Sequence, residues 1–257
     1  MTITPRSGLD LDGRAGVVTG AARGMGLEIS RFLGGLGAEV IMADIDDRAV
    51  AQSATALEAQ GMQVRPVRCD VASAEGLAGL VAEAGDRLDF VVNNAAAYAE
   101  LPPEKLENIE PELWDRVQAV NVRGVWNVSR LLLPALAASG RGRIVNIASS
   151  IAFRGTPLAL HYVSSKAAVL GLSKAMAREV GDRNITVNVV APGFTWTNAS
   201  LDKVTDDAEL DAQVARRTLR RPQMPDDVVG AVAFFCSDLA SYITGQTLIV
   251  DGGSHMI

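Results

Sequence analysis

The sequence predicts an α/β fold in which helices cover both faces of a seven-stranded parallel sheet. Short apolar runs alternate with helical patterns along the chain. These runs are rich in Val and Ile and are continuous rather than alternating, which is typical of strands buried on both faces. Strand and helix in alternation favour parallel strands joined by right-handed crossovers, and therefore a doubly wound sheet.

The predicted strands can be justified one by one from the residues that end them. The first run stops at a glycine-rich turn, the second at Asp44, the third before Asp70, the fourth at Asn93, the fifth before Ser149 and the sixth before Pro192-Gly193. The strands are expected at 15–19, 39–43, 63–68, 90–93, 143–148, 186–191 and 247–250. Helices are expected near 25–36, 46–60, 73–84, 111–137, 160–181 and 226–236.

No linker rich in Pro, Ser or Gly divides the chain, so we predict one domain over residues 1–257 with an N-terminal extension at 1–10. The rhythm breaks at 195–221, which is polar and weakly periodic. Because this segment follows the carboxyl end of a strand, where open parallel sheets bind ligands, it is predicted to form a substrate lid. A surface excursion without a role is the alternative.

Composition excludes several classes of function. The chain has 24 basic and 30 acidic residues, a net charge of −6, and no basic block, which argues against a nucleic-acid partner. No apolar stretch approaches the roughly 18 residues of a membrane span, and the first residues lack the apolar region of a secretory signal. Two cysteines, Cys69 and Cys236, are too few for a disulfide framework or a metal site. We therefore expect a cytoplasmic protein with two reduced, inert thiols and no bound metal.

A glycine-rich turn follows the first strand and opens the first helix. It reads TGAARGMG from Thr19 to Gly26, with glycines at 20, 24 and 26. Glycines let the backbone approach a pyrophosphate, and the helix N-terminus supplies N–H groups and partial positive charge. The spacing G-x-x-x-G-x-G departs from the commoner G-x-G-x-x-G. The turn predicts a dinucleotide site, with a merely structural turn as the alternative.

Tyr162 and Lys166 are four residues apart on a predicted helix, so they share one face. An ammonium beside a phenol favours the phenolate and is expected to lower the tyrosine pKa. A tyrosine tuned in this way can give and take a proton near neutral pH. The same pair also occurs on solvated helix faces, which is the alternative for this motif taken alone.

These motifs, with Ser149 thirteen positions before Tyr162, resemble the short-chain dehydrogenase/reductase family over about residues 11–253. The resemblance implies a single-domain, NAD-type member with a Rossmann-like fold. It also implies the catalytic set Asn121, Ser149, Tyr162 and Lys166.

The resemblance gives each member of this set a role. Tyr162 is the general acid/base, and Lys166 lowers its pKa and holds the nicotinamide ribose. Ser149 orients the substrate oxygen; the spacing to the tyrosine selects it over Ser150. Asn121 holds a water that links the lysine to solvent.

Asp44 lies eighteen positions after Gly26 and is predicted to accept hydrogen bonds from the adenosine ribose. A carboxylate here would repel a 2′-phosphate, so NAD is predicted rather than NADP. Arg23 could instead pair with that phosphate, and a helix cap is the alternative for Asp44. The chain has Ala96 where the family usually has glycine. The predicted cofactor contacts are Gly20, Arg23, Gly24, Met25, Gly26, Asp44, Asp70, Val71, Asn94, Ala95, Tyr162, Lys166, Pro192, Gly193, Thr195 and Thr197.

The resemblance implies an NAD-dependent oxidoreductase acting on CH–OH groups, which interconverts a secondary alcohol and its ketone. The substrate would be surrounded by Ala97, Tyr98, Ile151, Phe153, His161, Phe194 and Trp196. This mostly apolar set suits an alcohol or ketone bearing a ring better than a highly charged sugar acid. His161 is expected to pack beside the pocket, because neighbouring helix positions point about 100° apart.

Two other functions stay open. One is reduction of a 3-oxoacyl thioester on a carrier protein with NADPH, and the other is a non-catalytic NAD-binding sensor. The resemblance also implies a homotetramer built on the two long helices, near 111–137 and 160–181, and on the last strand.

Overall fold

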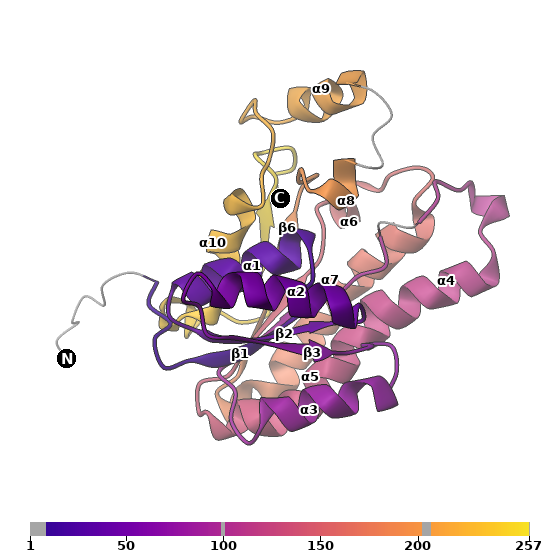
Figure 1. The fold of residues 1–257 in the computed structure, drawn as a ribbon. Coiled ribbons are helices and arrows are strands. Elements are labelled where there is room, and N and C mark those ends of the chain that lie inside the picture. Colours follow the sequence, from indigo (N-terminus) through magenta and orange to yellow (C-terminus); the bar gives the residue numbers. More distant parts are fainter. Residues whose placement is uncertain (1–8, 99–100, 202–206, 257) are drawn as a thin grey trace.

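The computed structural model describes residues 9–98, 101–201 and 207–256, and within them it shows the predicted parallel sheet (Figure 1). The strand order is β3-β2-β1-β4-β5-β6-β7, and every neighbouring pair is parallel. The order reverses between β1 and β4, which is where a ligand crevice forms in such sheets. The strands are β1 (Ala15–Thr19), β2 (Glu39–Asp44), β3 (Val64–Arg68), β4 (Phe90–Asn93), β5 (Arg143–Ile147), β6 (Thr186–Pro192) and β7 (Thr247–Val250).

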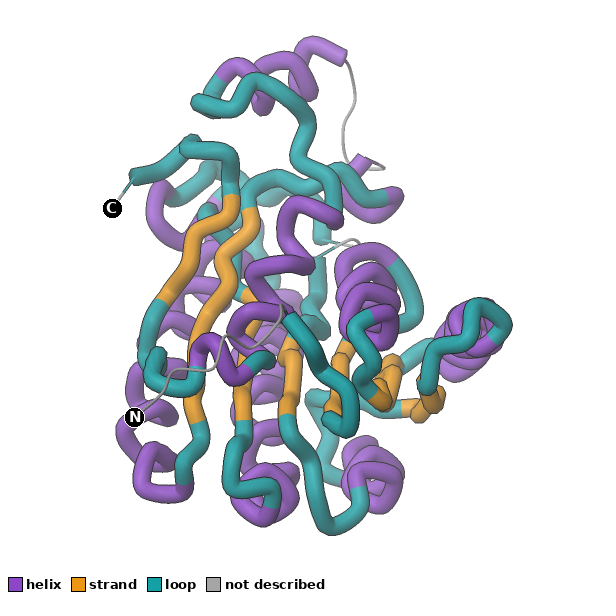
Figure 2. Tube along the Cα trace, turned by 90° about the vertical axis from the view of Figure 1, so that its left-hand side faces the viewer, coloured by secondary structure: helices purple, strands orange, loops and turns teal. Residues whose placement is uncertain are grey.

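Helices cover both faces of the sheet and enclose two separate cores (Figures 1 and 2). One face is packed by α1 (Gly24–Gly35), α2 (Asp47–Glu58) and α10 (Asp226–Cys236). The other is packed by α3 (Ala78–Ala84), α5 (Gly124–Ala138) and α7 (Leu160–Val180). Burial on both faces explains why the strand residues form continuous apolar runs.

The structure differs from the sequence expectation in the helices. The single helix expected at 111–137 is divided into α4 (Pro111–Gln118), a π-helical turn (Ala119–Arg123) and α5. Periodicity alone does not reveal one extra residue in a turn. Three helices were not expected: α6 (Ile151–Arg154), α8 (Asn198–Leu201) and α9 (Asp207–Ala215). The first two are a single turn long, and α9 has little amphipathic pattern. Short 3-10 turns lie at Glu75–Leu77, Leu106–Asn108, Gly181–Arg183 and Asp238–Ala240.

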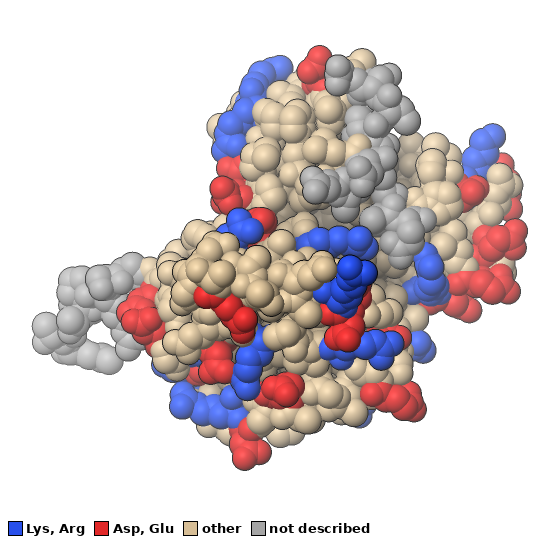
Figure 3. Space-filling view, in the orientation of Figure 1, with Lys and Arg blue, Asp and Glu red and all other residues tan. Residues whose placement is uncertain are grey.

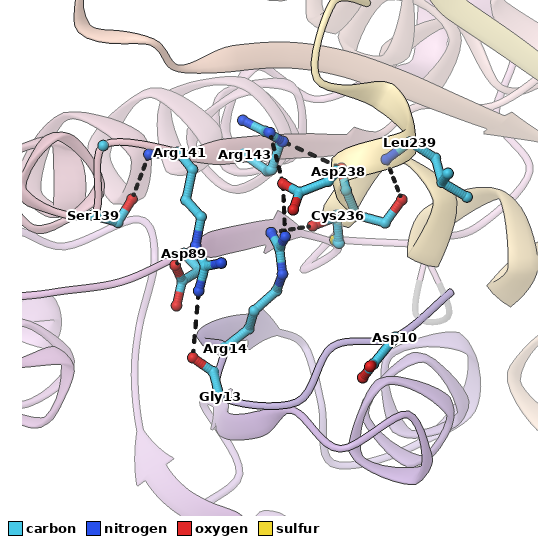
Figure 4. Close-up of polar contacts among 12 residues, drawn as sticks. Asp10, Gly13, Arg14, Asp89, Ser139, Arg141, Arg143, Cys236, Asp238 and Leu239 are labelled. Atoms are coloured by element: carbon cyan, nitrogen blue, oxygen red, sulfur yellow. Dashed lines mark hydrogen bonds and ion pairs between the residues drawn. The ribbon is translucent and has the colours of Figure 1, made fainter. Parts of the chain in front are cut away.

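A buried ionic cluster holds the end of α10 against the amino-terminal edge of the sheet (Figure 4). The Arg14 guanidinium lies 2.7 Å from the Asp238 carboxylate and donates to the Cys236 carbonyl at 3.2 Å. Arg143 is fully buried and donates to the Ser237 carbonyl at 3.4 Å. Cations are favourable at a helix C-terminus, where carbonyl groups have no partner within the helix. The cluster therefore ties β1 and β5 to the last helix.

Among the described helices, none has the length and apolar character needed to cross a bilayer.

Candidate active site

A cavity of about 610 Å³ lies where β1, β2, β4, β5 and β6 end. Small-molecule and cofactor sites typically occupy roughly 300–1,000 Å³. Most of the residues predicted from the sequence meet in its lining. These are Gly20, Arg23, Gly24, Met25, Gly26, Asp44, Asp70, Val71, Asn94, Ala95, Ala97, Tyr98, Ser149, Ile151, Tyr162, Lys166, Pro192, Gly193, Phe194, Thr195 and Thr197.

The glycine-rich turn requires glycine at both of its ends. Gly20 has a φ of +66°, and a Cβ there would lie 2.8 Å from the Ala95 Cα. A Cβ on Gly26 would collide with the Gly20 carbonyl oxygen. The two ends of the turn therefore pack closely against each other. The first residues of α1, Gly24 to Gly26, line the cavity, and the two glycines among them have no side chain that would stand in the way.

Asp44 ties the second strand to this turn. One carboxylate oxygen accepts the Ala22 N–H at 3.0 Å, and the other accepts the Asp46 N–H at 3.0 Å. The cap of α2 is Asp46, which accepts the Ala49 N–H at 3.0 Å. The capping alternative for Asp44 is therefore wrong, and its carboxylate lies in the cavity wall.

The loop after β4 is braced against the end of β1. The Thr19 hydroxyl accepts the N–H groups of Asn94 and Ala95 at 3.0 and 3.1 Å. The Asn94 amide donates to the carbonyls of Thr19 and Gly20 at 2.9 and 3.1 Å. Ala96 is not among the described non-glycine residues with positive φ, so this position does not require the glycine that the family usually has.

Ser149, Tyr162 and Lys166 meet at the centre of the cavity. Ser149 lies two residues after the end of β5, and its side chain is hydrogen-bonded to the Tyr162 side chain. Lys166 lies one turn beyond Tyr162 on α7, with Nζ 5.7 Å from the centroid of the phenol ring. This ammonium donates to the Ile147 carbonyl at 2.8 Å. The ring of Tyr98 covers Tyr162, with centroids 5.0 Å apart.

Burial dominates the titration of this pair, contrary to the expectation from the sequence. Desolvation raises the pKa of Tyr162 well above its ordinary value; Tyr98 raises it further, and the hydrogen bond with Ser149 lowers it. Desolvation lowers the pKa of Lys166 to about 8. The expectation that the ammonium lowers the Tyr162 pKa is wrong for this arrangement, because the buried Nζ is turned toward the Ile147 carbonyl and desolvation of the phenol dominates.

Asn121 lies behind the cavity wall rather than in it. It is buried in the π-helical turn, where its side-chain oxygen accepts the Ala97 N–H at 2.7 Å. Its amide donates to the Ser165 hydroxyl at 2.9 Å and to the Ala97 carbonyl at 3.3 Å. The Asn121 side chain thus joins the loop after β4, at Ala97, to α7 at Ser165. That Asn121 also holds a water molecule stays a prediction.

Three predicted substrate residues are not in the cavity lining: Phe153, His161 and Trp196. His161 is buried, and its Nδ1 accepts the backbone N–H of Tyr162 at 2.9 Å, so it packs beside the site as expected. Phe153 packs against a small buried cluster formed by Val125, Ala148, Val169, Val189 and Ala191. The sequence could not give these orientations, because they depend on the unpredicted turn of α6 and on the path after β6.

The structure also brings residues into the lining that the sequence did not single out. Arg154 lies five residues beyond Ser149, and Arg116 comes from α4. A search for charged residues just beyond a strand end would have found Arg154, whereas nothing in the local sequence marks Arg116. Cys69 also lines the cavity. It and Cys236 are free and buried, and burial raises the pKa of both thiols to about 12, as expected for inert cysteines.

Comparison with known proteins adds to this geometry. The family described as "Enoyl-(Acyl carrier protein) reductase" matches residues 20–255. The chain is 34% identical to dehydrogenase/reductase SDR family member 4 of Oryctolagus cuniculus, over 95% of this chain and 94% of the relative. It is also 34% identical to the 3-oxoacyl-[acyl-carrier-protein] reductase FabG of Escherichia coli, over 97% of this chain and 100% of the relative.

A solved structure from Beutenbergia cavernae is similar throughout. It is described as a candidate NAD(P)-dependent gluconate 5-dehydrogenase with bound NADP at low occupancy. The TM-score is 0.89 at 37% identity, and the match covers 96% of this chain and 98% of the other.

Proposed function

Because the chain belongs to the short-chain dehydrogenase/reductase family of oxidoreductases, we propose that it interconverts a secondary alcohol and its ketone with NAD. One observation carries the proposal: Ser149, Tyr162 and Lys166 line the same cavity as the glycine-rich turn. A proton donor and a dinucleotide cradle in one cavity are what hydride transfer to a carbonyl requires.

The residues present fit a dinucleotide. The close packing of Gly20 against Gly26 keeps the turn tight, and the open position beside Gly24, where an added Cβ would meet only the Thr197 Cβ at 4.0 Å, leaves room for a pyrophosphate at the start of α1. The cavity volume is sufficient. The nicotinamide supplies or accepts the hydride when it is bound. The other proposed contacts, from Asp44 to Thr197, line the same cavity.

The protein's own groups handle the proton. Because burial raises the Tyr162 pKa, its phenol carries a proton at neutral pH and can donate it to a carbonyl oxygen during reduction. In oxidation the same oxygen takes the proton from the alcohol. Ser149, already hydrogen-bonded to Tyr162, orients the substrate oxygen. The Lys166 ammonium, 5.7 Å from the centroid of the phenol ring, lies near enough to hold the nicotinamide ribose.

Asp44 supports NAD rather than NADP. Its carboxylate is fixed by Ala22 and Asp46 at the cavity wall, where a 2′-phosphate would meet like charge. Arg23 also lines the cavity, and NADP is bound in the Beutenbergia cavernae structure. A direct comparison of the two cofactors therefore decides this point.

Asp44→Ala is expected to raise the NADP-to-NAD ratio of kcat/KM by about 100-fold, since like charges about 4 Å apart near a surface repel by about 4 kcal/mol before screening. The control is Asp46→Ala. Asp46 lies two residues after Asp44 and carries the same charge, but its side chain does not line the cavity. This substitution should weaken the α2 cap and leave the ratio unchanged. An unchanged ratio in Asp44→Ala would remove Asp44 as the selector.

Gly26→Ala is expected to weaken NADH binding by about 10-fold or more and to destabilise the fold by about 1–3 kcal/mol, because the added methyl group collides with the Gly20 carbonyl. Fluorescence titration and thermal unfolding measure the two effects. The control on the same helix is Gly35→Ala, whose Cβ meets nothing within 4 Å. Normal NADH binding by Gly26→Ala would contradict the proposed cradle.

A second candidate is reduction of a carrier-protein 3-oxoacyl thioester with NADPH. It is favoured by the 34% identity to the FabG reductase of Escherichia coli and by Arg23 in the lining. A sensor that binds NAD without turnover has less support, since it would not need Ser149, Tyr162 and Lys166 in one cavity.

One assay separates these functions: reduced-cofactor absorbance is followed with NAD and NADP separately against a panel of aliphatic and aromatic secondary alcohols. Turnover with NAD supports the proposed enzyme. Turnover restricted to NADP, with activity on acetoacetyl thioesters, would favour the carrier-protein reductase. Cofactor binding without turnover would favour the sensor.

We also propose that 195–221 acts as a substrate lid within the domain and that the enzyme is a cytoplasmic homotetramer. Residues from the start of this segment, Thr195, Thr197 and Ser200, line the cavity, and α8 and α9 extend beyond the sheet (Figure 1). Exposed apolar side chains on the predicted interface elements support the tetramer: Trp126 on α5 is 46% exposed and Leu248 on β7 is 41% exposed.

A further inference from the structure

We propose that Arg154 binds an anionic group of the substrate, a carboxylate or a phosphate, in the part of the cavity lined by α6 and Ser149. The proposal rests on the proposed oxidoreductase function of this cavity and names the class of substrate that it takes. It also revises the sequence-based preference for an uncharged alcohol.

Arg154 is placed by the chain that carries Ser149. The strand β5 ends, Ser149 follows, and the single turn of α6 runs from Ile151 to Arg154. Gly155, with a φ of +68°, then turns the chain away. Arg154 lines the same cavity as Ser149 and Tyr162. A substrate whose oxygen is held between these two groups therefore lies within the space that Arg154 borders.

Charge is unevenly distributed along the cavity. The acidic residues of the described lining are Asp44 and Asp70, and both lie at the end of the glycine-rich turn, where Asp44 binds Ala22. No carboxylate lies in the described lining near Ser149, whereas Arg154 does. The substrate end of the cavity therefore favours negative charge.

Arg154 has no counter-ion of its own. No hydrogen bond or ion pair joins it to any residue of the described ranges. The acid whose charge acts on it is Asp251, and its carboxylate already accepts the N–H groups of Gly253 and Ser254 and contacts His255. The guanidinium thus retains donors in a fork geometry that matches a carboxylate or phosphate.

A second guanidinium approaches from another element. Arg216 follows α9, and its charge acts on Arg154. Partial burial, and then Arg216, lower the Arg154 pKa, while Asp251 raises it. Figure 3 shows basic side chains gathered over the segment that follows α9. Arg154 therefore lies in the field of a second cation from another element, which favours an anion at this part of the cavity.

The test compares charged and uncharged alcohols that are otherwise alike. The carboxylate pairs are lactate with methyl lactate, mandelate with methyl mandelate, and gluconate with glucitol; the phosphate pair is glucitol phosphate with glucitol. We expect the wild-type kcat/KM to favour the charged member of at least one pair by about 10-fold or more, and Arg154→Gln to abolish that preference. Arg154→Glu should reverse it. Whichever pair shows the effect identifies the anion as carboxylate or phosphate.

The control is Arg183→Gln, which removes an exposed arginine before β6, at the opposite edge of the sheet. It should keep the wild-type preference. Equal use of both members of every pair, or a preference that survives in Arg154→Gln, would overturn the inference while leaving the oxidoreductase proposal intact.

If no alcohol is turned over, the oxidoreductase proposal fails. The role of Arg154 is then tested by the binding of the charged and uncharged probes. The readout is then the melting temperature of the NADH-loaded protein with each probe. Stabilisation by the charged probes in wild type and in Arg183→Gln, but not in Arg154→Gln, would uphold the anion site. No such stabilisation would overturn it.

Discussion

Tyr162→Phe is expected to lower turnover by about 100- to 10,000-fold, because this substitution removes the proton that the substrate oxygen must exchange. NADH binding should persist, since the ring stays in place against Tyr98. The fold should lose no more than about 1 kcal/mol, for one hydrogen bond with Ser149. Steady-state rates, fluorescence titration and thermal unfolding measure the three quantities.

The matched control removes the same atom from the neighbouring ring. Tyr98 lines the cavity, and its ring centroid is 5.0 Å from that of Tyr162. Tyr98→Phe therefore tests whether a second phenol in the cavity could supply the proton. We expect an effect smaller than about 10-fold, because Ser149 is hydrogen-bonded to Tyr162. Activity retained in Tyr162→Phe and lost in Tyr98→Phe would transfer the acid/base role to Tyr98.

Lys166→Met is expected to reduce turnover by about 100-fold or more, because the cation proposed to hold and orient the nicotinamide ribose is lost, and yet to stabilise the protein at neutral pH. The ammonium is buried, and its pKa falls from 10.5 to about 8, which corresponds to a penalty of about 3 kcal/mol while the group is charged. Leaving the Ile147 carbonyl without its donor costs about 1 kcal/mol. A net gain of about 2 kcal/mol in the free energy of unfolding should result.

The sign of the pH dependence follows from the two protonation equilibria. Between pH 8 and pH 10.5 the unfolded chain binds more protons at Lys166 than the folded chain does, so wild-type stability rises with pH across this window. The advantage of Lys166→Met should therefore be greatest below pH 8 and disappear above pH 10.5.

The control for this stability effect is Lys174→Met, on an exposed position of the same helix. Its stability should change by less than about 0.5 kcal/mol at every pH. A Lys166→Met protein that is less stable than wild type throughout would show that the ammonium is well accommodated in the folded protein.

The sequence predicted the sheet almost residue for residue because each strand is a continuous apolar run ended by a turn former. Helix boundaries in regular segments followed for the same reason. The π-helical turn at Asn121 could not be predicted, because one extra residue in a helical turn leaves the composition of the segment unchanged. The short α6 was missed as well, and with it the direction of Phe153 and the place of Arg154.

The candidate site divides in the same way. Residues at strand ends, such as Asp44 and Ser149, could be assigned from the sequence because parallel strands bring their carboxyl ends to one edge. The titration of Tyr162 and Lys166 could not, because desolvation depends on how completely Tyr98 and the strands enclose them. A spacing of four residues establishes a shared helix face, but it does not establish that Nζ will turn to the Ile147 carbonyl.

The cluster of Arg14, Arg143 and Asp238 constrains the order in which the chain can mature during synthesis. Arg14 precedes the first strand, and its carboxylate partner is 224 residues later, beyond the last helix. Until the ribosome has released that stretch, the sheet edge holds two guanidinium groups without Asp238 and without the carbonyls of α10. We therefore expect the amino-terminal strands to lack this brace until α10 and Asp238 have been synthesised, so the two arginines find these partners only at the end of synthesis.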